Sequence, residues 1–343
     1  MKIEENVPLK TLTTFKVGGP ARYVITCTQV SDVEEAIAFA CAQNLPLIVL
    51  GGGSNVLALD AGYPGVVLLI RMEGTTVVEE TNEHSIYEVS AGVPWDTFVT
   101  FVAEQSLWGI ENLSGIPGSV GATPVQNIGA YGMDVSQTIT SVKVYNTLTE
   151  QIETIPASAC QFTYRDSRFK HEPHLIILSV MFDLSRTGVP HIGYPDLRKA
   201  QEEGVPLETP TEIAEAVREI RSHKFPDLRQ YGTAGSFFKN PIITPEQFAD
   251  LSKQYGAIPS FPHPDGIKIP LAFILDRVLS LKGYKNGNTF LFGNQPLVVV
   301  ADTHATSKDI EHLAQDIEKK VFDATGITIE REVTLFVAHE IIF

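Results

Sequence analysis

The first part of the chain shows both periodicities that mark regular structure. Residues 22–27 and 46–50 are short apolar runs that are typical of buried strands. Between them, Ser31 and Glu34 have the spacing of a capping box that opens a helix. The apolar residues of this helix recur at intervals of three and four: Val33, Ala36, Ile37, Ala40 and Cys41. This order predicts a βαβ unit that leads into the glycine-rich turn GGGSN at 51–55.

The middle of the chain is predicted to be rich in sheet. A helix over residues 94–105 carries Trp95, Phe98, Val99 and Val102 on one face. Short apolar or alternating runs predict strands at five places: 66–70, 86–90, 141–146, 151–155 and 175–184. The pattern therefore predicts a mixed fold and excludes an all-helical one.

A domain boundary is predicted after residue 224. Thr209, Pro210 and Glu212 carry the signals of a helix start, and the segment KFPDL follows this helix. Beyond it, the pattern predicts helices after Thr244, over 271–279 and over 306–325, and a strand at 297–301. We therefore expect a second domain to begin near Phe225.

The last predicted strand covers residues 327–337. Because side chains of a strand alternate, Glu330, Glu332 and Thr334 would share one face. The opposite face would carry five residues: Ile329, Arg331, Val333, Leu335 and Val337. Two carboxylates would thus line one side of this strand.

Charge and cysteine content narrow the possible partners. The 26 Lys and Arg residues against 41 Asp and Glu give a formal charge of −15, which disfavours nucleic acid and anionic membranes. Cys27, Cys41 and Cys160 lie far apart and form no CxxC motif, so we expect neither a disulfide framework nor a metal site. No export signal or membrane segment is visible. We expect a cytoplasmic protein.

Two glycine-rich segments suggest a nucleotide site. GGGSN follows a predicted strand, and consecutive glycine amides can form a concave nest for phosphate. It matches neither the Rossmann fingerprint, because Val56 stands at the third glycine position, nor the P-loop. A tight turn alone would also explain it. The second segment, 115–132, adds Gln126, Asn127 and Tyr131, and together the two suit a pyrophosphate and an aromatic ring.

Two polar segments leave both structural and chemical interpretations open. YRDSRFK at 164–170 is either a solvated charge run or the source of a guanidinium that binds a carboxylate. GSFFKNP at 235–241 is either a loop anchored by two Phe side chains or the position of a reactive Ser236. His171 and His174 favour a surface loop over a metal site. The serine-hydrolase motif GxSxG is absent.

Five motifs in order resemble one enzyme family over essentially the whole chain. They are GGGSNVL at 51–57, IPGSVGATPVQNIGAYG at 116–132, YRDSRFK at 164–170, GSFFKNP at 235–241 and EREV at 330–333. This set resembles the UDP-N-acetylenolpyruvoylglucosamine reductases. The resemblance implies a cytosolic flavoenzyme of peptidoglycan precursor synthesis, which uses NADPH through non-covalent FAD to form UDP-N-acetylmuramate.

The resemblance also implies an α+β fold and a domain plan. Residues 1–224 would form an FAD-binding region of the vanillyl-alcohol-oxidase (PCMH) type, with subdomains at about 1–70 and 71–224. Residues 225–326 would form a smaller α/β substrate-binding domain, and the strand 327–343 would return to the first region. The FAD would contact both glycine-rich segments. The residues concerned are Gly51, Gly52, Gly53, Ser54, Asn55, Ile116, Pro117, Gly118, Ser119, Gly121, Ala122, Gln126, Asn127, Gly129, Ala130, Tyr131 and Gly132.

The family's chemistry maps onto three residues of this chain. Arg165 matches the catalytic arginine, Ser236 the proton donor and Glu332 the C-terminal catalytic glutamate. Tyr194 lies in a loop of the longer family type, where the tyrosine closes over the UDP-sugar. The resemblance implies substrate contacts for six residues: Tyr194, Lys224, Lys239, Asn240, Lys282 and Gln295. The chain departs from the family's usual pattern at Ser119 and in the Glu330 dipeptide.

Elementary chemistry is consistent with these assignments. Hydride addition to the vinyl carbon leaves negative charge on the adjacent carbon and the substrate carboxylate. Arg165 would stabilise that charge, Glu332 would need a raised pKa in a dry site, and Ser236 would protonate the carbanion-like enolate. NADPH and substrate would use the same flavin face in turn.

Two other functions stay open at this point. A flavin oxidase of the same fold often tethers FAD to a histidine, and no histidine precedes His84. A nucleotide-sugar binding protein without catalysis would be colourless when purified.

Overall fold

The computed structural model describes residues 1–337. Helices and strands occur along the whole of this length, including β1 (Lys2–Pro8) and η1 (Leu9–Thr11) before residue 22, where no element is predicted. The α-helices are α1 (Val30–Ala42), α2 (Trp95–Glu104), α3 (Arg168–His171), α4 (Pro195–Glu202), α5 (Pro210–Lys224), α6 (Pro245–Tyr255), α7 (Leu271–Phe273) and α8 (Ser307–Thr325). A π-helical turn, η6 (Ile274–Val278), continues α7. Short 3-10 helices are η1 (Leu9–Thr11), η2 (Glu111–Leu113), η3 (Val120–Ala122), η4 (Val135–Gln137) and η5 (Ala157–Ala159).

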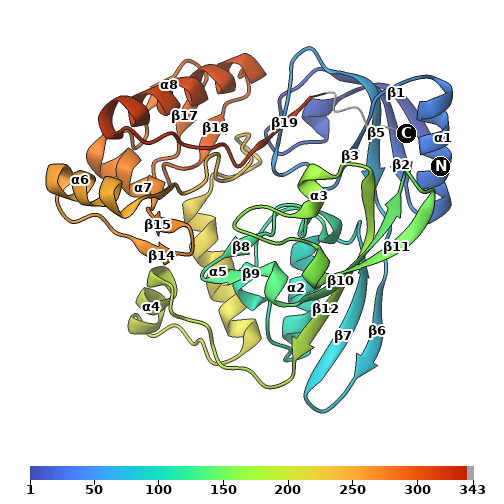
Figure 1. The fold of residues 1–343 in the computed structure, drawn as a ribbon, viewed down its shortest axis with the longest axis horizontal. Coiled ribbons are helices and arrows are strands. Elements are labelled where there is room, and N and C mark those ends of the chain that lie inside the picture. The colour runs from blue at the N-terminus through green and yellow to red at the C-terminus, as the bar shows by residue number, and fades with distance from the viewer. Residues whose placement is uncertain (338–343) are drawn as a thin grey trace.

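The first sheet contains the predicted βαβ unit (Figure 1). Its strands, in spatial order, are β1 (Lys2–Pro8), β2 (Pro20–Cys27), β5 (Tyr63–Ile70) and β3 (Leu47–Leu50). Strands β2 and β3 both run parallel to β5, and α1 connects them. The βαβ prediction is confirmed, and the GGGSN turn directly follows β3.

Two details of α1 differ from the prediction. Cys41 is exposed, so it does not belong to the buried face. The helix begins at Val30, before the predicted cap at Ser31. The Asp32 carboxylate, in place of a Ser31 cap, accepts the backbone N–H groups of Thr28 and Gln29 at 2.8 and 3.2 Å.

The second sheet is entirely antiparallel. Its strands, in spatial order, are β11 (Gln151–Pro156), β10 (Ile139–Asn146), β12 (Leu175–Ser185), β7 (His84–Ser90) and β6 (Thr75–Glu80). Every residue of β6 is exposed. This edge strand is not predicted from the sequence, because a strand with no buried face has no hydrophobic alternation.

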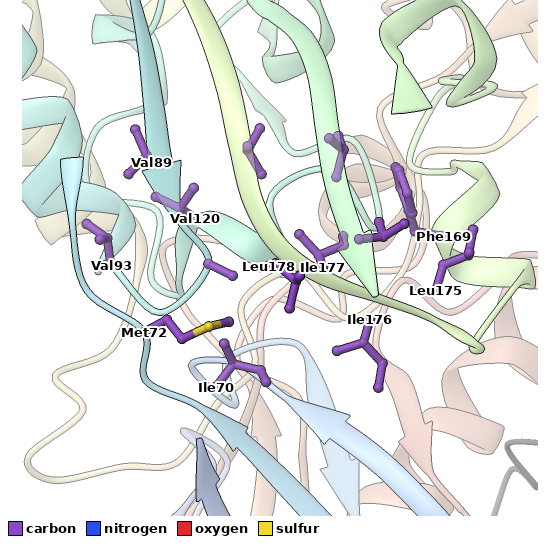
Figure 2. Close-up of a cluster of buried hydrophobic side chains, with 14 of the residues drawn as sticks. Ile70, Met72, Val89, Val93, Val120, Phe169, Leu175, Ile176, Ile177 and Leu178 are labelled. Carbon is purple, nitrogen blue, oxygen red and sulfur yellow. The ribbon is translucent and has the colours of Figure 1, made fainter. Parts of the chain in front are cut away.

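One large core joins the two sheets. It contains side chains from α1 and the first sheet together with side chains from α2 and the second sheet. Figure 2 shows part of it, where residues of β5, β7, β12 and α3 gather. The glycine-rich segment 115–132 packs into this core through Val120 and Ile128. It contains β8 (Gly129–Ala130), which pairs with β9 (Met133–Asp134) directly after the segment.

A second core lies beyond α5. Buried side chains of α8, η6 and the segment 234–299 form most of it, and Phe15, Val17 and Leu57 join from the first part of the chain. Two small sheets flank it: β13 (Ile242–Ile243), β15 (Gly266–Lys268) and β14 (Phe261–His263), and then β16 (Lys285–Asn286), β17 (Thr289–Leu291) and β18 (Val299–Ala301). The boundaries of the domains stay a prediction.

The last described segment runs from the second core to a smaller cluster of buried side chains that includes Leu50, Tyr63 and Phe336. Strand β19 (Thr334–Phe336) leaves the second core and pairs in parallel with β4 (Val56–Ala58), next to the first sheet (Figure 1). The predicted continuous strand 327–337 is therefore wrong in extent. Residues 327–333 form no continuous strand: Arg331 makes one isolated bridge, with Phe238, and the ladder with β4 begins at Thr334. Residues 338–343 of the predicted strand lie outside the described residues.

Candidate active site

A cavity of about 400 Å³ opens between the two glycine-rich segments. All three residues expected to be catalytic, Arg165, Ser236 and Glu332, line it. Most of the residues expected to hold the cofactor line it too: Gly51, Gly52, Gly53, Ser54, Asn55, Ile116, Pro117, Gly118, Ser119, Gly121, Ala122, Gln126 and Gly129. The remaining four, Asn127, Ala130, Tyr131 and Gly132, are not among the residues that line this cavity.

Missing side chains allow the two glycine-rich segments to touch. A Cβ atom added at Gly52 would lie 2.6 Å from the Gly118 Cα, and one at Gly51 would lie 2.6 Å from the Ser119 Oγ. Gly53 has a φ of +66°, which side chains disfavour. The Ser54 hydroxyl donates a 2.8 Å hydrogen bond to the Pro117 carbonyl and fastens the segments together. These contacts make a narrow, backbone-lined groove that suits a nucleotide cofactor.

Asn127 does not line the cavity, and its side chain has a structural role. Its side chain is buried, donates to the Thr163 carbonyl at 3.0 Å and accepts the Ser136 N–H at 3.1 Å. The amide therefore connects the second glycine-rich segment to the chain just before Arg165.

Arg165 has an unusual backbone and a fixed guanidinium. Its φ of +56° lies in the left-handed region, which is strained for an arginine. The guanidinium donates to the carbonyls of Asn127, at 3.4 Å, and Gly129, and lies 3.3 Å from the Asp134 carboxylate. Its Nε is 3.2 Å from Glu332 Oε1. This geometry presents a rigid positive group at the cavity wall.

Glu332 and Ser236 lie on adjacent segments. The Glu332 N–H donates to the Phe237 carbonyl at 2.8 Å, which places the glutamate next to the segment that starts at Ser236. Only 15% of the Glu332 side chain is exposed. Burial raises the pKa of Glu332, although Arg165, Lys170 and Lys239 pull it down. A carboxyl that retains its proton more readily than usual thus borders the cavity.

Glu330 and Glu332 both lie near Lys170 and Lys239, which is consistent with the predicted shared face. They differ in exposure: Glu330 is exposed and 3.0 Å from Lys239, whereas Glu332 is largely buried and 3.2 Å from Arg165. Of the two, only Glu332 lines the large cavity.

Tyr194 and Lys224 form a separate cluster with Tyr131. The rings of Tyr131 and Tyr194 meet edge to face, with centroids 5.1 Å apart. Lys224 Nζ lies 5.9 Å from each ring centroid and 2.5 Å from Asp196 Oδ2. The structure thus brings two expected substrate residues together with one expected cofactor residue.

The other expected substrate residues are dispersed. Lys239 and Asn240 line a second cavity of about 250 Å³, which also includes Tyr164. Lys282 is exposed. The Gln295 side chain accepts the N–H of Leu297 at 3.5 Å, and neither Lys282 nor Gln295 lines either cavity.

Two basic residues at the large cavity were missed by the sequence analysis. Arg221 of α5 donates to the Gly115 carbonyl at 3.0 Å, stacks on Phe225, and has a pKa lowered by burial. Burial also lowers the pKa of Lys170, with Lys239 nearby. Neither residue carries a distinctive sequence signal. Arg221 is one of several basic residues at the end of a predicted helix, and Lys170 is one of several charged residues in the segment 164–170. Arg221 can hold an anion beside the second glycine-rich segment.

Comparison with family models divides the chain in two. Residues 21–154 match an FAD binding domain, and residues 227–336 match the UDP-N-acetylenolpyruvoylglucosamine reductase C-terminal domain. The matched domain and the backbone-lined cavity define an FAD-binding oxidoreductase. The predicted α+β fold with an FAD-binding region of the PCMH type is confirmed.

Curated relatives of nearly equal length carry the reductase name. The chain is 36% identical to the UDP-N-acetylenolpyruvoylglucosamine reductase of Pseudomonas syringae pv. syringae, over 98% of this chain and 99% of the relative. The enzyme of Polynucleobacter asymbioticus is 38% identical, over 96% of both chains. The solved reductase of Thermus caldophilus has the same fold, with a TM-score of 0.69 and 22% identity over 98% of this chain and 99% of that one. The chain belongs to the UDP-N-acetylenolpyruvoylglucosamine reductase family.

Proposed function

We propose that this chain is an NADPH-dependent, FAD-containing reductase that converts UDP-N-acetylenolpyruvoylglucosamine to UDP-N-acetylmuramate. The observation that carries this proposal is the convergence of Arg165, Ser236 and Glu332 on the cavity between the glycine-rich segments. Family membership supports the same reaction. The curated relatives named above are reductases, so they favour neither a flavin oxidase nor a binding protein without catalysis.

The large cavity suits FAD on three structural grounds. Gly52 and Gly118 approach so closely that a side chain at Gly52 would collide with backbone. The surrounding backbone can hold phosphate without many basic side chains, and Arg221 adds a positive group where the second segment begins. When bound, FAD would supply the hydride-transfer chemistry between NADPH and the vinyl group of the substrate.

Arg165 is assigned to the negative charge that develops on the substrate. After hydride addition, charge spreads from the carbon that bears the ether oxygen into the substrate carboxylate. A guanidinium held by two carbonyls and two carboxylates is already oriented, so little reorganisation is needed when the charge forms. Glu332, in its neutral form, can donate a hydrogen bond to the other carboxylate oxygen.

Ser236 is assigned as the proton donor. Gly235 before it has a φ of +77°, and Ser236 itself forms a β-bridge with Val298, so the backbone that carries the hydroxyl is well defined. The hydroxyl proton moves to the carbon next to the carboxylate and completes the lactyl ether. A serine is a weak acid, but an enolate of this type is basic enough to accept its proton at contact distance.

The substrate's diphosphate is assigned to the cluster around Lys224. Tyr194 is 38% exposed, burial raises the pKa of its phenol, and Lys224 carries the positive charge beside its ring. Asn240 and Lys239 would contribute from the second cavity, and Lys282 and Gln295 would require a rearrangement to join them.

We also propose residues 1–224 and 225–326 as the FAD-binding and substrate-binding regions, and a cytoplasmic location. No helix in the described part of the chain is long and apolar enough to cross a membrane.

An absorption experiment tests the reaction. The purified protein should be yellow and should release FAD on denaturation. Under anaerobic conditions NADPH should bleach the flavin, and UDP-N-acetylenolpyruvoylglucosamine should restore the colour. A colourless protein would favour the binding function, whereas a flavin reoxidised only by oxygen would favour the oxidase.

A further inference from the structure

Arg331 precedes Glu332 but its side chain binds helix α8. The guanidinium Nη1 donates to both oxygens of Glu311 at 2.8 and 2.9 Å. Its Nε and Nη2 donate to the two oxygens of Glu318 at 2.6 and 3.4 Å. One arginine therefore binds Glu318 through two nitrogens and Glu311 through a third, so two carboxylates of α8 restrict its guanidinium.

The backbone around Arg331 is also held from the other side. Lys239 N–H donates to the Glu330 carbonyl at 2.9 Å, and Glu332 N–H donates to the Phe237 carbonyl at 2.8 Å. Phe238 and Arg331 form the β-bridge between these hydrogen bonds. The Arg331 guanidinium also lies 5.9 Å from the centroid of the Phe237 ring. Residues 330–332 are thus fixed between the segment 237–239 and helix α8.

The alternation of side chains along residues 330–332 relates the contact between Arg331 and α8 to the position of Glu332 in the cavity wall. In an extended segment, neighbouring side chains point in opposite directions. Binding of Arg331 to α8 therefore directs the Glu332 carboxylate away from α8 and toward Arg165, 3.2 Å away. A rotation of this segment would turn Glu332 out of the cavity wall.

We propose that Arg331 is a positioning residue that holds Glu332 in place through Glu311 and Glu318. The catalytic part of this inference rests on the proposed function. The Arg331 pairs differ from ordinary surface salt bridges, which contribute little, because 27% of the Arg331 side chain is exposed and it bonds both carboxylates at once. The second core thereby fixes a group that lines the cofactor cavity.

The test compares three changes at this anchor with one matched control. Arg331→Ala removes the contacts with α8. Arg331→Lys keeps the positive charge but has a single nitrogen to bind both glutamates. The double variant Glu311→Gln, Glu318→Gln removes the negative charges that Arg331 binds. Arg277→Ala is the control, because Arg277 is exposed and its nearest carboxylate, of Asp276, is 3.8 Å away. Holoenzyme variants are compared by thermal melting, by both anaerobic half-reactions in stopped flow, and by hydrogen exchange of residues 329–334.

Arg331→Ala should slow flavin reoxidation at saturating substrate by about 10- to 100-fold, because misplacing a reacting group has costs of this size. Flavin reduction by NADPH should stay within about twofold of wild type. Hydrogen exchange of residues 329–334 should be faster in Arg331→Ala than in wild type. The double variant Glu311→Gln, Glu318→Gln should show the same changes as Arg331→Ala. Arg331→Lys should recover part of the loss, and Arg277→Ala should match wild type.

Two results would overturn the proposal. Unchanged exchange and unchanged reoxidation in Arg331→Ala would show that Arg331 does not fix Glu332. Equal slowing of both half-reactions in Arg331→Ala and Arg331→Lys, with lowered melting temperatures, would assign Arg331 to general stability. If substrate fails to reoxidise the wild-type flavin, the proposed function fails instead, and the exchange measurement still decides whether Arg331 fixes the segment.

Discussion

Replacing Arg165 by lysine removes geometry while keeping the positive charge. The arginine faces Glu332 at 3.2 Å and Asp134 at 3.3 Å, and it donates to the carbonyls of Asn127 and Gly129. A lysine has one nitrogen, so it cannot occupy all these directions and also meet a substrate carboxylate with two prongs. Loss of one preorganised donor to a developing oxyanion costs about 2.7–4 kcal/mol, or about 10²- to 10³-fold in rate.

The assay is anaerobic stopped flow with separate half-reactions. Arg165→Lys should slow reoxidation by the enolpyruvyl substrate by about 10²- to 10³-fold at saturation, with little change in reduction by NADPH. Arg168→Lys is the matched control in the same motif, since Arg168 pairs with Glu172 at 2.7 Å and is not among the residues lining the cavity. Reoxidation within threefold of wild type in Arg165→Lys, or equal slowing of both half-reactions, would refute the assigned role.

Three further predictions concern the proton donor, the substrate loop and the buried acid. Ser236→Ala should leave flavin reduction near normal but slow reoxidation by about 10²- to 10⁴-fold, with partial recovery in Ser236→Cys; loss of both steps would indicate a structural residue. Tyr194→Phe should keep the ring contact with Tyr131 but weaken substrate binding by about 1–3 kcal/mol; a fall in reoxidation at saturating substrate would contradict a pure binding role. Because burial raises the pKa of Glu332, its active neutral form should persist to higher pH than in an exposed glutamate. Reoxidation measured against pH should fall as the pH rises through that raised pKa, and a Glu332→Gln variant with the same profile would assign the titration to another group.

Local signals predicted many elements well. Thr209 and Glu212 predicted the start of α5, where they form a capping box between residues only three apart. The helix predicted over 306–325 corresponds to α8, which the structure caps with Thr306 and ends at Gly326 in the left-handed conformation. The buried strands of both sheets were predicted for a similar reason, since burial leaves a hydrophobic pattern in the sequence.

Tertiary interactions explain what the sequence pattern missed. Residues 330–332 pair with the segment 237–239 through one isolated bridge, between Arg331 and Phe238, so the regular strand is confined to Thr334–Phe336. Arg221 reaches the cavity only because α5 packs beside the segment that begins at Gly115. The positions of Arg165, Ser236 and Glu332 at one cavity came from the family resemblance, since no spacing rule relates residues so far apart in the chain.

The contact between Asn55 and the C-terminal segment has a consequence for folding kinetics. The Asn55 side chain donates to the Glu332 carbonyl at 3.1 Å, which joins residues 277 positions apart. Closing a flexible loop of that length costs about 5 kcal/mol of chain entropy, so this contact forms readily only after other structure has shortened the effective loop. During refolding from denaturant, far-ultraviolet circular dichroism should therefore recover before catalytic turnover, because the helices and both sheets are assembled from nearer neighbours.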